Sequence, residues 1–573
     1  MHDINTIINS DEYKRIETDV ESFVEKRLKH YRPVASNGKT IHDPVWGSIE
    51  YQGWEMQIID SPLFQRLRDI HQVGLAMLTY PAARHSRFEH SLGVASAAKL
   101  MCDRINKANE NDSIPDDVRN CIVLAALLHD IGHCFYSHLS ESVYGEIMGF
   151  PELRRVFTEE LELKPKPHEI LSFIIINSKA FRLFFTESIA YPLNEKSVDG
   201  LLKDVGCMII GEPITKDGIV LSYQTSIING PFDADKLDYI KRDSYTAGLA
   251  LQYDIERLFT KVRIHQIKDD NNNIIEKRLV IDINGITAVE ELTFCKIMLF
   301  SYIYYHQKVL ISESLIKDIA YSLCKLGVIS SFSGFLENTD SEFLHLVERA
   351  EGQPFEKYGN INLAELVRNI TNRNLPKRCF EISQANIVPL SDVEKDDETK
   401  YCTQMLQKIR SDSAYDIDSL MSDIIKIAPN LIGGKKMMDI SDIIDPYQNL
   451  SFEEMLAKRQ VIYKALTLAY EEKGKSIDFS IFDVHIVFPN LVNYGSMAEK
   501  VVLGKDQQNL LTINDFVKLN DWADSFNSNK WRGYVFVSEK IDINIAFRVS
   551  EKIILGNKAR LRNPQAYLKG LDC

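Results

Sequence analysis

From Val118 to Leu128 the chain is apolar on nearly all sides of the helix that its hydrophobic pattern predicts. A helix of this kind is central in a protein rather than peripheral. The apolar run ends abruptly in a polar cluster, which contains His129, Asp130, His133 and His138. A buried helix rarely ends in three histidines and an aspartate unless these side chains bind a common partner. We therefore expect a divalent metal at this end of the helix.

The pattern elsewhere is mainly helical. Apolar residues at helical spacing predict an amphipathic helix in residues 1–30 and a further helix in 60–73. A long helix is predicted across 288–315. The segment 229–248 is predicted to start with a turn and become a helix, which would carry Asp235, Tyr239 and Asp243 on one face because they lie four residues apart. Ser113 and Asp116 predict a capping box at the start of the apolar helix, with Pro115 in its first turn.

Strand patterns are confined to two regions. RIHQI and RLVIDI flank the turn-rich DDNNN and predict a β-hairpin across residues 263–282. Between 478 and 555, strands are predicted in FSIFDVHIVF, EKVVL, GYVFVS and IDINIAFRV. The sequence thus predicts a mainly α fold, with a helical core and a small β-hairpin, followed by a mixed α+β C-terminal lobe. We place the boundaries at 1–30 for an N-terminal helical extension, 31–315 for the core domain and 316–573 for the lobe.

Composition narrows the function classes. The 573 residues are 45% hydrophobic and 26% charged, with a net charge of −14, which is typical of globular protein and argues against a surface for nonspecific nucleic-acid binding. We find no signal peptide and no apolar run long enough to span a membrane. The nine cysteines form no Cys-x-x-Cys pair, which indicates reduced thiols. We therefore expect a soluble, cytoplasmic protein.

His90, His129, Asp130 and Asp235 are the candidate metal ligands. Neutral imidazole and carboxylate suit a catalytic divalent metal, whereas thiolates would indicate structural zinc. Two histidines and two aspartates also leave coordination positions for water and a substrate oxygen. Taken singly, a histidine in an apolar helix is more often a satisfied core residue, and Asp235 could be a helix cap. The complete set favours a metal, which could be Mg, Mn, Fe or Zn.

Three segments carry a resemblance to a known family. RFEHSLGV (87–94), LLHDIGHCFYSH (127–138) and FDADKLDYIKRD (232–243) resemble the HD-domain deoxynucleoside triphosphate triphosphohydrolases, vertebrate members and bacterial dGTPase-like members alike. The similarity runs from about Lys39 to Val309 and returns faintly at 483–500. The short stretch before it leaves no room for the sterile-alpha-motif domain of the vertebrate members. The resemblance implies that 31–315 is an HD phosphohydrolase domain and 316–573 a regulatory and oligomerisation lobe.

The resemblance also implies roles for individual residues. The metal ligands would be those already named. Residues that match substrate contacts, to the triphosphate or the sugar, are Arg87, Gln72, Lys236, Tyr239, Asp243 and Tyr305. Residues that match the group around the scissile phosphate are His133, His138, His168 and Glu141. In this group His138 would be the general acid and Glu141 would orient it.

A regulatory site is implied as well. Lys39, Asp60, Gln65 and Arg68 match residues that bind a nucleotide activator between subunits, so we expect a GTP or dNTP effector and a homo-oligomer, a dimer or a tetramer. The chain also departs from the family. His42, Gln307 and the INGI at 283–286 replace family residues that contact nucleotide, and a substrate arginine falls near Lys296 or Ile297. The activator and the preferred base are therefore left open.

Three functions compete on this sequence. The first is an effector-regulated enzyme that converts a dNTP and water to a deoxynucleoside and tripolyphosphate. The second is an HD nucleotide phosphodiesterase or 5′-nucleotidase, which would release no tripolyphosphate. The third is a nucleotide-sensing scaffold with a decayed site, against which the intact ligand set argues. Depletion of dNTPs in antiviral defence is an analogy with the family and does not follow from the residues.

Overall fold

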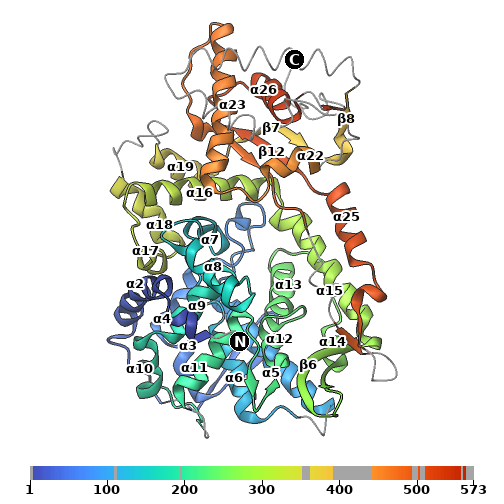
Figure 1. Ribbon diagram of the computed structural model, residues 1–573. Helices are drawn as coiled ribbons and strands as arrows, with labels where there is room; N and C mark the ends of the chain where they lie inside the picture. The colour runs from blue at the N-terminus through green and yellow to red at the C-terminus, as the bar shows by residue number, and fades with distance from the viewer. Residues whose placement is uncertain are drawn as a thin grey trace. The chain divides into compact units, whose positions relative to one another are not determined.

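The computed structural model describes residues 4–35, 37–108, 113–193, 197–350, 362–390, 441–492, 501–503, 510–556 and 559–562. Many of its helices and strands are labelled in Figure 1. The chain divides into two compact units. The first unit contains residues 1–300, 327–346 and 494–520, and the second contains 301–326, 347–493 and 521–573.

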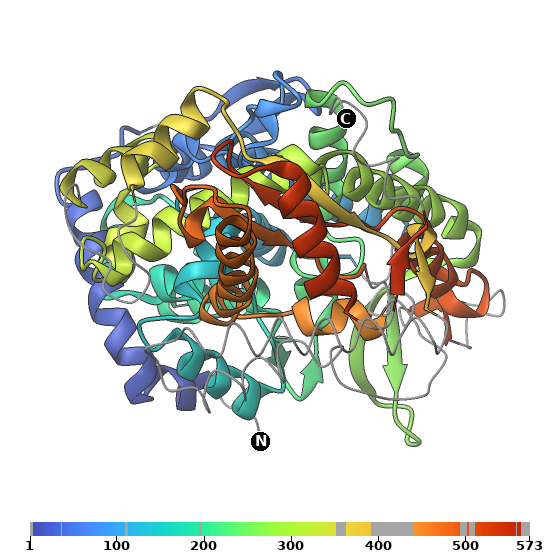
Figure 2. The same ribbon diagram turned by 90° about the horizontal axis from the view of Figure 1, so that it is seen from above.

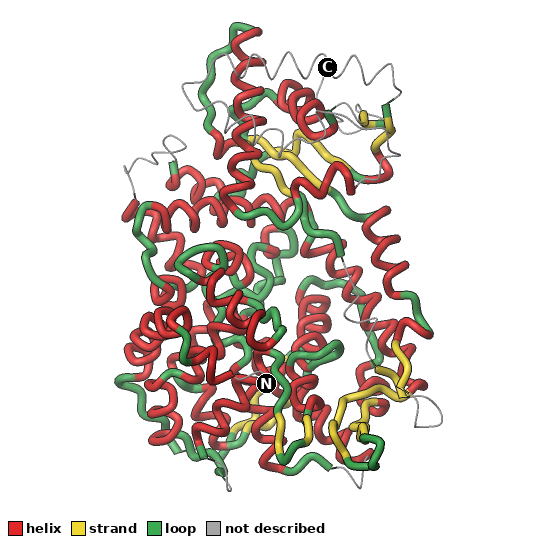
Figure 3. The backbone as a smooth tube through the Cα atoms, viewed as in Figure 1, coloured by secondary structure: helices red, strands yellow, loops and turns green. Residues whose placement is uncertain are grey.

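The first unit is mostly helical, as the red segments of Figure 3 show. Its core is built from α5 (Arg87–Ala108), α6 (Asp116–Leu128), α9 (Pro167–Asn177), α11 (Val198–Ile210) and α13 (Ala234–Thr246). Helix α6 packs against α5 and α11, while α13 packs against α5 and α11 packs against α9. Every residue of α6 from Cys121 to Leu128 is buried, which confirms that this apolar helix is central.

The remaining helices of the first unit surround this core. They are α1 (Ile4–Ile8), α2 (Asp11–Leu28), α3 (Gly53–Ile59), α4 (Pro62–Gln65), α7 (His138–Tyr144), α8 (Phe150–Leu161), α10 (Lys179–Ser188), α12 (Ser222–Ile228), α14 (Ile255–Lys261), α15 (Ile286–Leu299), α17 (Phe332–Glu337) and α18 (Asp340–His345). The amphipathic N-terminal helix is confirmed as α2, whose apolar side is buried from Tyr13 to Leu28. Among the described residues, no helix has both the length and the apolar character to span a membrane.

The predicted hairpin is present as β5 (Val262–Lys268) and β6 (Ile274–Asp282), paired antiparallel. Strand β6 also pairs in parallel with β4 (Ile219–Val220) and with β10 (Val501–Leu503). Two antiparallel strands complete this sheet, β3 (Thr215–Lys216) beside β4 and β11 (Leu510–Thr512) beside β10. A separate hairpin joins β1 (Lys39–Asp43) to β2 (Gly47–Tyr51).

The second unit mixes helices and strands. Its antiparallel sheet has the order β7 (Lys377–Ile382), β12 (Gly533–Val537), β9 (Val484–Val487). Helices α23 (Phe452–Glu472) and α26 (Ile543–Leu555) lie side by side against this sheet (Figure 2). Its other elements are α16 (Gln307–Lys325), α19 (Leu363–Thr371), β8 (Ile387–Pro389), α22 (Ser441–Ile444), most of α25 (Leu519–Asn529) and β13 (Ala559–Leu561). The fold is thus mainly α with a mixed α+β C-terminal region, as predicted.

Two predicted helices are interrupted in the structure. The helix expected in 60–73 is only α4 and a 3₁₀ turn, because the backbone from Ile70 to Gln72 pairs instead with the segment 85–87. Arg87 donates its amide to the Ile70 carbonyl, 2.9 Å away. The long helix expected in 288–315 is α15, a π-helical turn at Phe300–Tyr304 and then α16, which is capped anew by His306.

Two local predictions were wrong. Helix α6 begins at Asp116 directly after Pro115, with no side-chain cap, so Ser113 forms no capping box. The segment IDINIAFRV is not a strand, because it contains the start of α26. Asp542 caps that helix by accepting from the amides of Asn544 and Ile545, and apolar residues at helical spacing bury its inner face.

Candidate metal centre and active site

The turn after α6 carries most of the candidate residues, and α9 holds it in place. Ser172 of α9 donates its hydroxyl to the His129 carbonyl (2.7 Å) and accepts the Gly132 amide (2.9 Å). A β-carbon at Gly132 would lie 2.4 Å from the carbonyl oxygen of His168, so only glycine permits this approach. The contact brings the α6 turn against the first turn of α9, where His168 is located.

Three candidate ligands come together from different helices: His90 from α5, His129 from the end of α6 and Asp235 from α13. We call these three residues the metal group. One ligand atom from each lies within 4.8 Å of the others. Asp235 Oδ1 is 3.0 Å from His90 Nε2 and 3.9 Å from His129 Nε2. His90 is fully buried and His129 nearly so, whereas the Asp235 side chain is partly exposed. The group is therefore enclosed by protein and opens toward solvent on the Asp235 side.

The hydrogen bonds of the two histidines fit a metal ion. His90 Nδ1 donates to Asp238 Oδ2 (2.7 Å), and His129 Nδ1 donates to the Ala126 carbonyl (2.8 Å). In a neutral imidazole the other nitrogen, Nε2, then carries the lone pair. Both Nε2 atoms are buried and lack a hydrogen-bond partner, even though a carboxylate oxygen is close to each. Unpaired nitrogens that converge with carboxylates are the donor set of a divalent metal site.

Asp130 lies between the metal group and the other histidines. Its Oδ2 accepts from Arg87 Nη1 (2.8 Å) and is 3.6 Å from His90 Nε2. Its Oδ1 is 3.3 Å from His129 Nε2 and 3.2 Å from His133 Nε2. Burial acts to raise the pKa of Asp130, but Arg87 and the neighbouring imidazoles outweigh it and hold that pKa well below its usual range. The carboxylate is therefore ionised and available as a ligand.

Two carboxylates, Asp235 and Asp238, contact His90 and favour a positive charge on it. Burial acts to lower the pKa of His90, but Asp235 and Asp238 outweigh it and raise that pKa to about 10. The carboxyl pKa of Asp235 is lowered against its own burial, through the contact with His90. Carboxylates that attract a proton this strongly onto a buried imidazole would equally attract a divalent cation.

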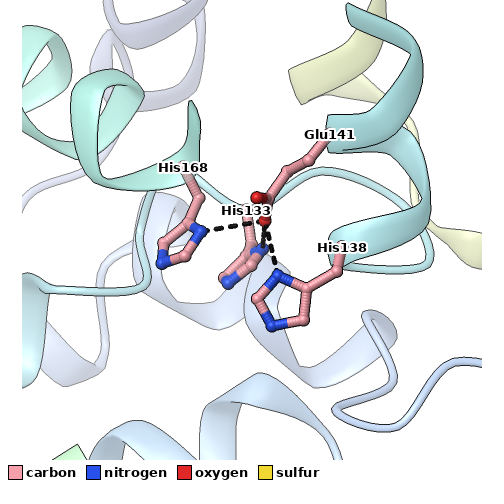
Figure 4. A group of neighbouring side chains, drawn as sticks. All are labelled: His133, His138, Glu141 and His168. Atoms are coloured by element: carbon pink, nitrogen blue, oxygen red, sulfur yellow. Dashed lines mark hydrogen bonds and ion pairs between the residues drawn. The ribbon is translucent and has the colours of Figure 1, made fainter. Parts of the chain in front are cut away.

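A second group gathers three imidazoles around one carboxylate (Figure 4). Glu141 Oε1 accepts from His138 Nδ1 (2.9 Å) and from His168 Nδ1 (2.8 Å), and it is 3.1 Å from His133 Nδ1. The rings of His133 and His168 are stacked, with centroids 3.9 Å apart. His138 is the exposed member, with 58% of its side chain accessible. These four residues could also hold a metal, but the hydrogen bonds to Glu141 favour proton transfer through His138.

The ionisable residues of this second group differ in their pKa values. Burial, Arg87 and His168 together lower the pKa of His133 to about 3, so this imidazole is neutral. Burial also acts to lower the pKa of His168, but the Glu141 carboxylate outweighs it and raises that pKa. Burial acts to raise the pKa of Glu141, whereas His168 and His138 hold it well below its usual range. The group therefore combines an ionised carboxylate with imidazoles of different basicity.

Arg87 and Lys236 are already engaged in the structure. Arg87 donates Nε to Ser137 Oγ (2.9 Å) and Nη1 to Asp130, while its buried Nη2 has no hydrogen-bond partner. Lys236 Nζ donates to the Gly230 carbonyl (2.8 Å) and to Asp233 Oδ2 (2.5 Å). Of the donors just named, only Arg87 Nη2 has no hydrogen-bond partner. Lys236 would have to break its bond with Asp233 before it could contact a phosphate.

The predicted sugar contacts are only partly assembled by the first unit. The Asp243 carboxylate lies 2.7 Å from His85 Nε2, and the backbone N–H of Gln72 donates to the backbone carbonyl of His85 (3.0 Å). Both residues therefore contact His85. Tyr239 is half-buried on α13, the helix of Asp235. Tyr305 belongs to the second unit, where its hydroxyl donates to the Asn490 carbonyl (2.6 Å).

The predicted effector residues lie near one another at the surface of the first unit. Lys39 Nζ is 3.3 Å from Asp60 Oδ2, and both side chains are exposed. Gln65 donates to the Ile59 carbonyl (2.7 Å) and accepts from Arg68 Nε (2.7 Å). This surface therefore carries two cationic side chains, Lys39 and Arg68, together with one amide and one carboxylate.

Sequence reasoning missed the residues that support the candidate metal ligands. Asp238 accepts from His90, from Trp46 Nε1 (2.6 Å) and from Arg242 through both oxygens (2.8 and 2.9 Å). Arg242 also donates to Asp43 (2.8 Å). The spacing of Asp235 and Asp238, three residues apart on one helix face, could have indicated the second carboxylate. The contact with Trp46 joins segments far apart in the chain and left no local signal.

Parts of this chain match known protein families. Residues 87–191 match the HD domain, and residues 254–428 match the HD associated region. The deoxynucleoside triphosphate triphosphohydrolase SAMHD1 homolog of Dictyostelium discoideum is 28% identical over 385 residues, which are 66% of this chain and 65% of that protein. The SAMHD1 of Mus musculus is 26% identical over 420 residues, 68% of this chain and 60% of that protein. The chain thus covers slightly less than two thirds of each.

Solved structures show the same fold. A phosphohydrolase from Bacteroides thetaiotaomicron aligns with a TM-score of 0.53 and 18% identity, over 87% of this chain and all of that one. A hypothetical protein from Aquifex aeolicus aligns with a TM-score of 0.51 and 19% identity, over 89% of this chain and 99% of that one. At these identities the likeness concerns the fold alone.

Proposed function

We propose that this chain, which belongs to the HD phosphohydrolase superfamily, is a metal-dependent dNTP triphosphohydrolase that converts a dNTP and water to a deoxynucleoside and tripolyphosphate. One observation carries the proposal. The unpaired Nε2 atoms of His90 and His129 converge with Asp130 and Asp235, directly beside a Glu141 carboxylate that accepts hydrogen bonds from His138 and His168. A candidate metal site adjoining a proton-transfer group suits metal-assisted hydrolysis of a phosphate ester.

Four residues would hold the metal: His90, His129, Asp130 and Asp235. When bound, a divalent ion of this kind polarises a phosphoryl oxygen and lowers the pKa of a coordinated water. Asp238 and the Ala126 carbonyl hold the two imidazoles in the tautomer that presents Nε2. These two acceptors orient both rings, and an ion that binds would take the place of the proton that the raised pKa of His90 implies on Nε2.

His138 is the proposed general acid. Its Nδ1 donates to Glu141, which leaves Nε2 to pass a proton to the leaving 5′ oxygen of the nucleoside. Its exposure allows a substrate to reach it, whereas His133 and His168 are buried. Arg87, through its open Nη2, and Lys236 would stabilise the charge that develops on the triphosphate. In the first unit, Gln72, Tyr239 and Asp243 are assigned to the sugar, and the match of Tyr305 to a sugar contact stays a prediction from the sequence.

Activation by a nucleotide is part of the proposal. Lys39, Asp60, Gln65 and Arg68 lie together and are largely exposed, so they could contact GTP or a dNTP at a subunit boundary. A guanine base offers donors for a carboxylate and acceptors for an arginine or amide, which suits Asp60 and Gln65. An effector that binds the assembled oligomer more tightly than free subunits would couple its own binding to activity.

Product analysis tests this function. The protein is incubated with Mn²⁺ and each dNTP, alone and with GTP, and the products are separated by ion exchange. We expect tripolyphosphate and deoxynucleoside in equal amounts. Release of inorganic phosphate instead would indicate a nucleotidase, and no consumption of any dNTP in any pairing would overturn the proposal.

Matched variants locate the activity in this site. His129→Ala and Asp130→Ala should abolish turnover, while His30→Ala, at an exposed histidine outside the site, should retain it. Circular dichroism shows whether each variant is folded. Full activity in folded His129→Ala would mean that the metal is bound elsewhere.

A further inference from the structure

The chain enters the helix of the proposed general acid through a strained turn. Tyr136 and Ser137 have φ of 50° and 55°, in the left-handed region that residues with a β-carbon rarely adopt. Helix α7 begins at the next residue, His138, and carries Glu141 one turn later. The direction of α7, and hence the place of His138 and Glu141, therefore depends on this turn. Such strain persists only where other contacts hold it.

A carboxylate from a distant part of the chain holds the turn. Asp340, at the start of α18, accepts the Tyr136 amide with Oδ1 (2.5 Å). Its Oδ2 accepts from the His71 amide (3.0 Å) and contacts His71 Nδ1 (2.6 Å). Asp340 is 3% exposed, so these bonds are made away from water, where losing an acceptor is costly. One side chain thus joins the turn before α7 to the loop of His71.

The two loops that Asp340 joins also contact residues of the proposed active site. Ser137 donates its hydroxyl to the His71 carbonyl (2.7 Å), and it accepts from Arg87 Nε. The next residue after His71 is Gln72, which is assigned to the sugar. We call Asp340, His71, Tyr136 and Ser137 the Asp340 clamp. The clamp adjoins His138, Arg87 and Gln72, although Asp340 itself contacts none of these three residues.

We infer that Asp340 is a positioning residue, which sets the turn at Tyr136–Ser137 and through it the orientation of His138 and Glu141. Its place in the chain supports a dedicated role, because residues 327–346 belong to the first unit although the chain on both sides of them belongs to the second. In addition, α18 has its own cap. Thr339 and Glu342 form a capping box, so Asp340 is not needed for that purpose.

Two variants separate positioning from helix stability. Asp340→Ala removes the two carboxylate oxygens that bind Tyr136 and His71. Glu342→Gln, on the same helix and at an exposed position, weakens the capping box and leaves the turn untouched. Asp340→Asn is intermediate, because its carbonyl can keep the Tyr136 amide while its NH₂ group cannot accept from His71.

The first measurement is hydrogen–deuterium exchange of the full chain, which requires no activity. We expect faster exchange in peptides that cover 134–144 and 70–73 for Asp340→Ala, less for Asp340→Asn and none for Glu342→Gln. Unchanged exchange in Asp340→Ala would overturn the inference. So would equal changes in Asp340→Ala and Glu342→Gln, since these would indicate a helix role only.

The second measurement is steady-state kinetics, and this part rests on the proposed function. A displaced catalytic group lowers the rate by about 100-fold when it moves by roughly 1 Å. We expect Asp340→Ala to lose about that factor in kcat with KM changed less than about threefold, and Asp340→Asn to recover part of the loss. A wild-type protein without activity would defeat the proposed function and leave the exchange result standing. A wild-type kcat in Asp340→Ala would defeat the positioning role.

Discussion

At the residue scale, each imidazole of the metal group uses its two nitrogens differently. Nδ1 is bound by a protein acceptor, a carboxylate for His90 and a carbonyl for His129, and Nε2 is left open. The acceptor would orient the ring toward the proposed metal, and a carboxylate acceptor would also raise the basicity of the ligand. Asp238 is therefore as much a part of the site as the ligands, although it would touch no ion.

Asp238→Asn should weaken metal binding. An amide is a poorer acceptor for His90 Nδ1–H than a carboxylate, and loss of such a partner typically lowers metal affinity about 10- to 100-fold. Isothermal titration with Mn²⁺ measures this change. Asp254→Asn, at an exposed helix cap, serves as the control. Wild-type affinity in Asp238→Asn would show that this carboxylate does not support the ligand.

His485 should make the stability of the second unit depend on pH. It is fully buried beside Ser314, and burial and Arg459 hold its pKa well below the usual value. The folded state cannot take the proton that the unfolded state binds below about pH 6.5, so stability falls as pH decreases, by at most about 1.4 kcal/mol per unit. Urea unfolding at pH 7 and pH 5.5 measures this loss, which His485→Gln should reduce. An equal loss in both proteins would contradict the assignment.

At the element scale, the site depends on how closely α5 approaches α13. A β-carbon at Gly93 of α5 would lie 1.8 Å from Asp238 Oδ1 and 2.4 Å from Arg242 Nη2. The absence of a side chain at Gly93 thus leaves room for the buried ion pair that orients His90. The two helices supply His90 and Asp235, so their separation sets the distance between these ligands.

Gly93→Ala should push α13 away from α5 and disturb both stability and metal binding. Overpacking of a buried position costs about 1–3 kcal/mol, which urea denaturation can resolve. Gly334→Ala is a suitable control, because its nearest new contact would be Ile329 Cγ2 at 3.3 Å. A Gly93→Ala protein with the stability of the wild type would show that the helices are not in such close contact.

At the scale of the whole molecule, the proposed metal joins three segments that are far apart in the chain. His90 comes from α5, His129 and Asp130 from the end of α6, and Asp235 from α13. An ion that binds only the folded arrangement must stabilise the folded state by mass action.

Removal of metal should therefore lower the melting temperature. At a free metal concentration 100-fold above Kd, the expected stabilisation is about 2.7 kcal/mol, which corresponds to a rise of several degrees in Tm. Differential scanning calorimetry with Mn²⁺ and with EDTA measures the difference. Asp235→Ala, which alters a partly exposed ligand, should show a much smaller one. Equal Tm values for the wild type with and without Mn²⁺ would contradict a site that spans these helices.

The sequence by itself determined the parts that depend on local spacing. The apolar run of α6, the adjacent His129 and Asp130 after it, the periodic face of α13 and the turn between β5 and β6 could all be read from neighbouring residues, because hydrophobic period and turn composition act within a few positions. The helix predicted in 60–73 was mostly wrong for the same reason, since pairing with residues 85–87 is a contact that local pattern does not contain.

Only the tertiary structure decided how those parts meet. Asp238 behind His90, Gly93 against Asp238 and Asp340 on the turn before His138 join residues separated by 145 to 204 positions. Contacts of this kind leave no period or motif in the chain, because they arise from the packing of whole helices. The donor set was therefore visible in the sequence, whereas the groups that orient it became visible only when the helices were packed together.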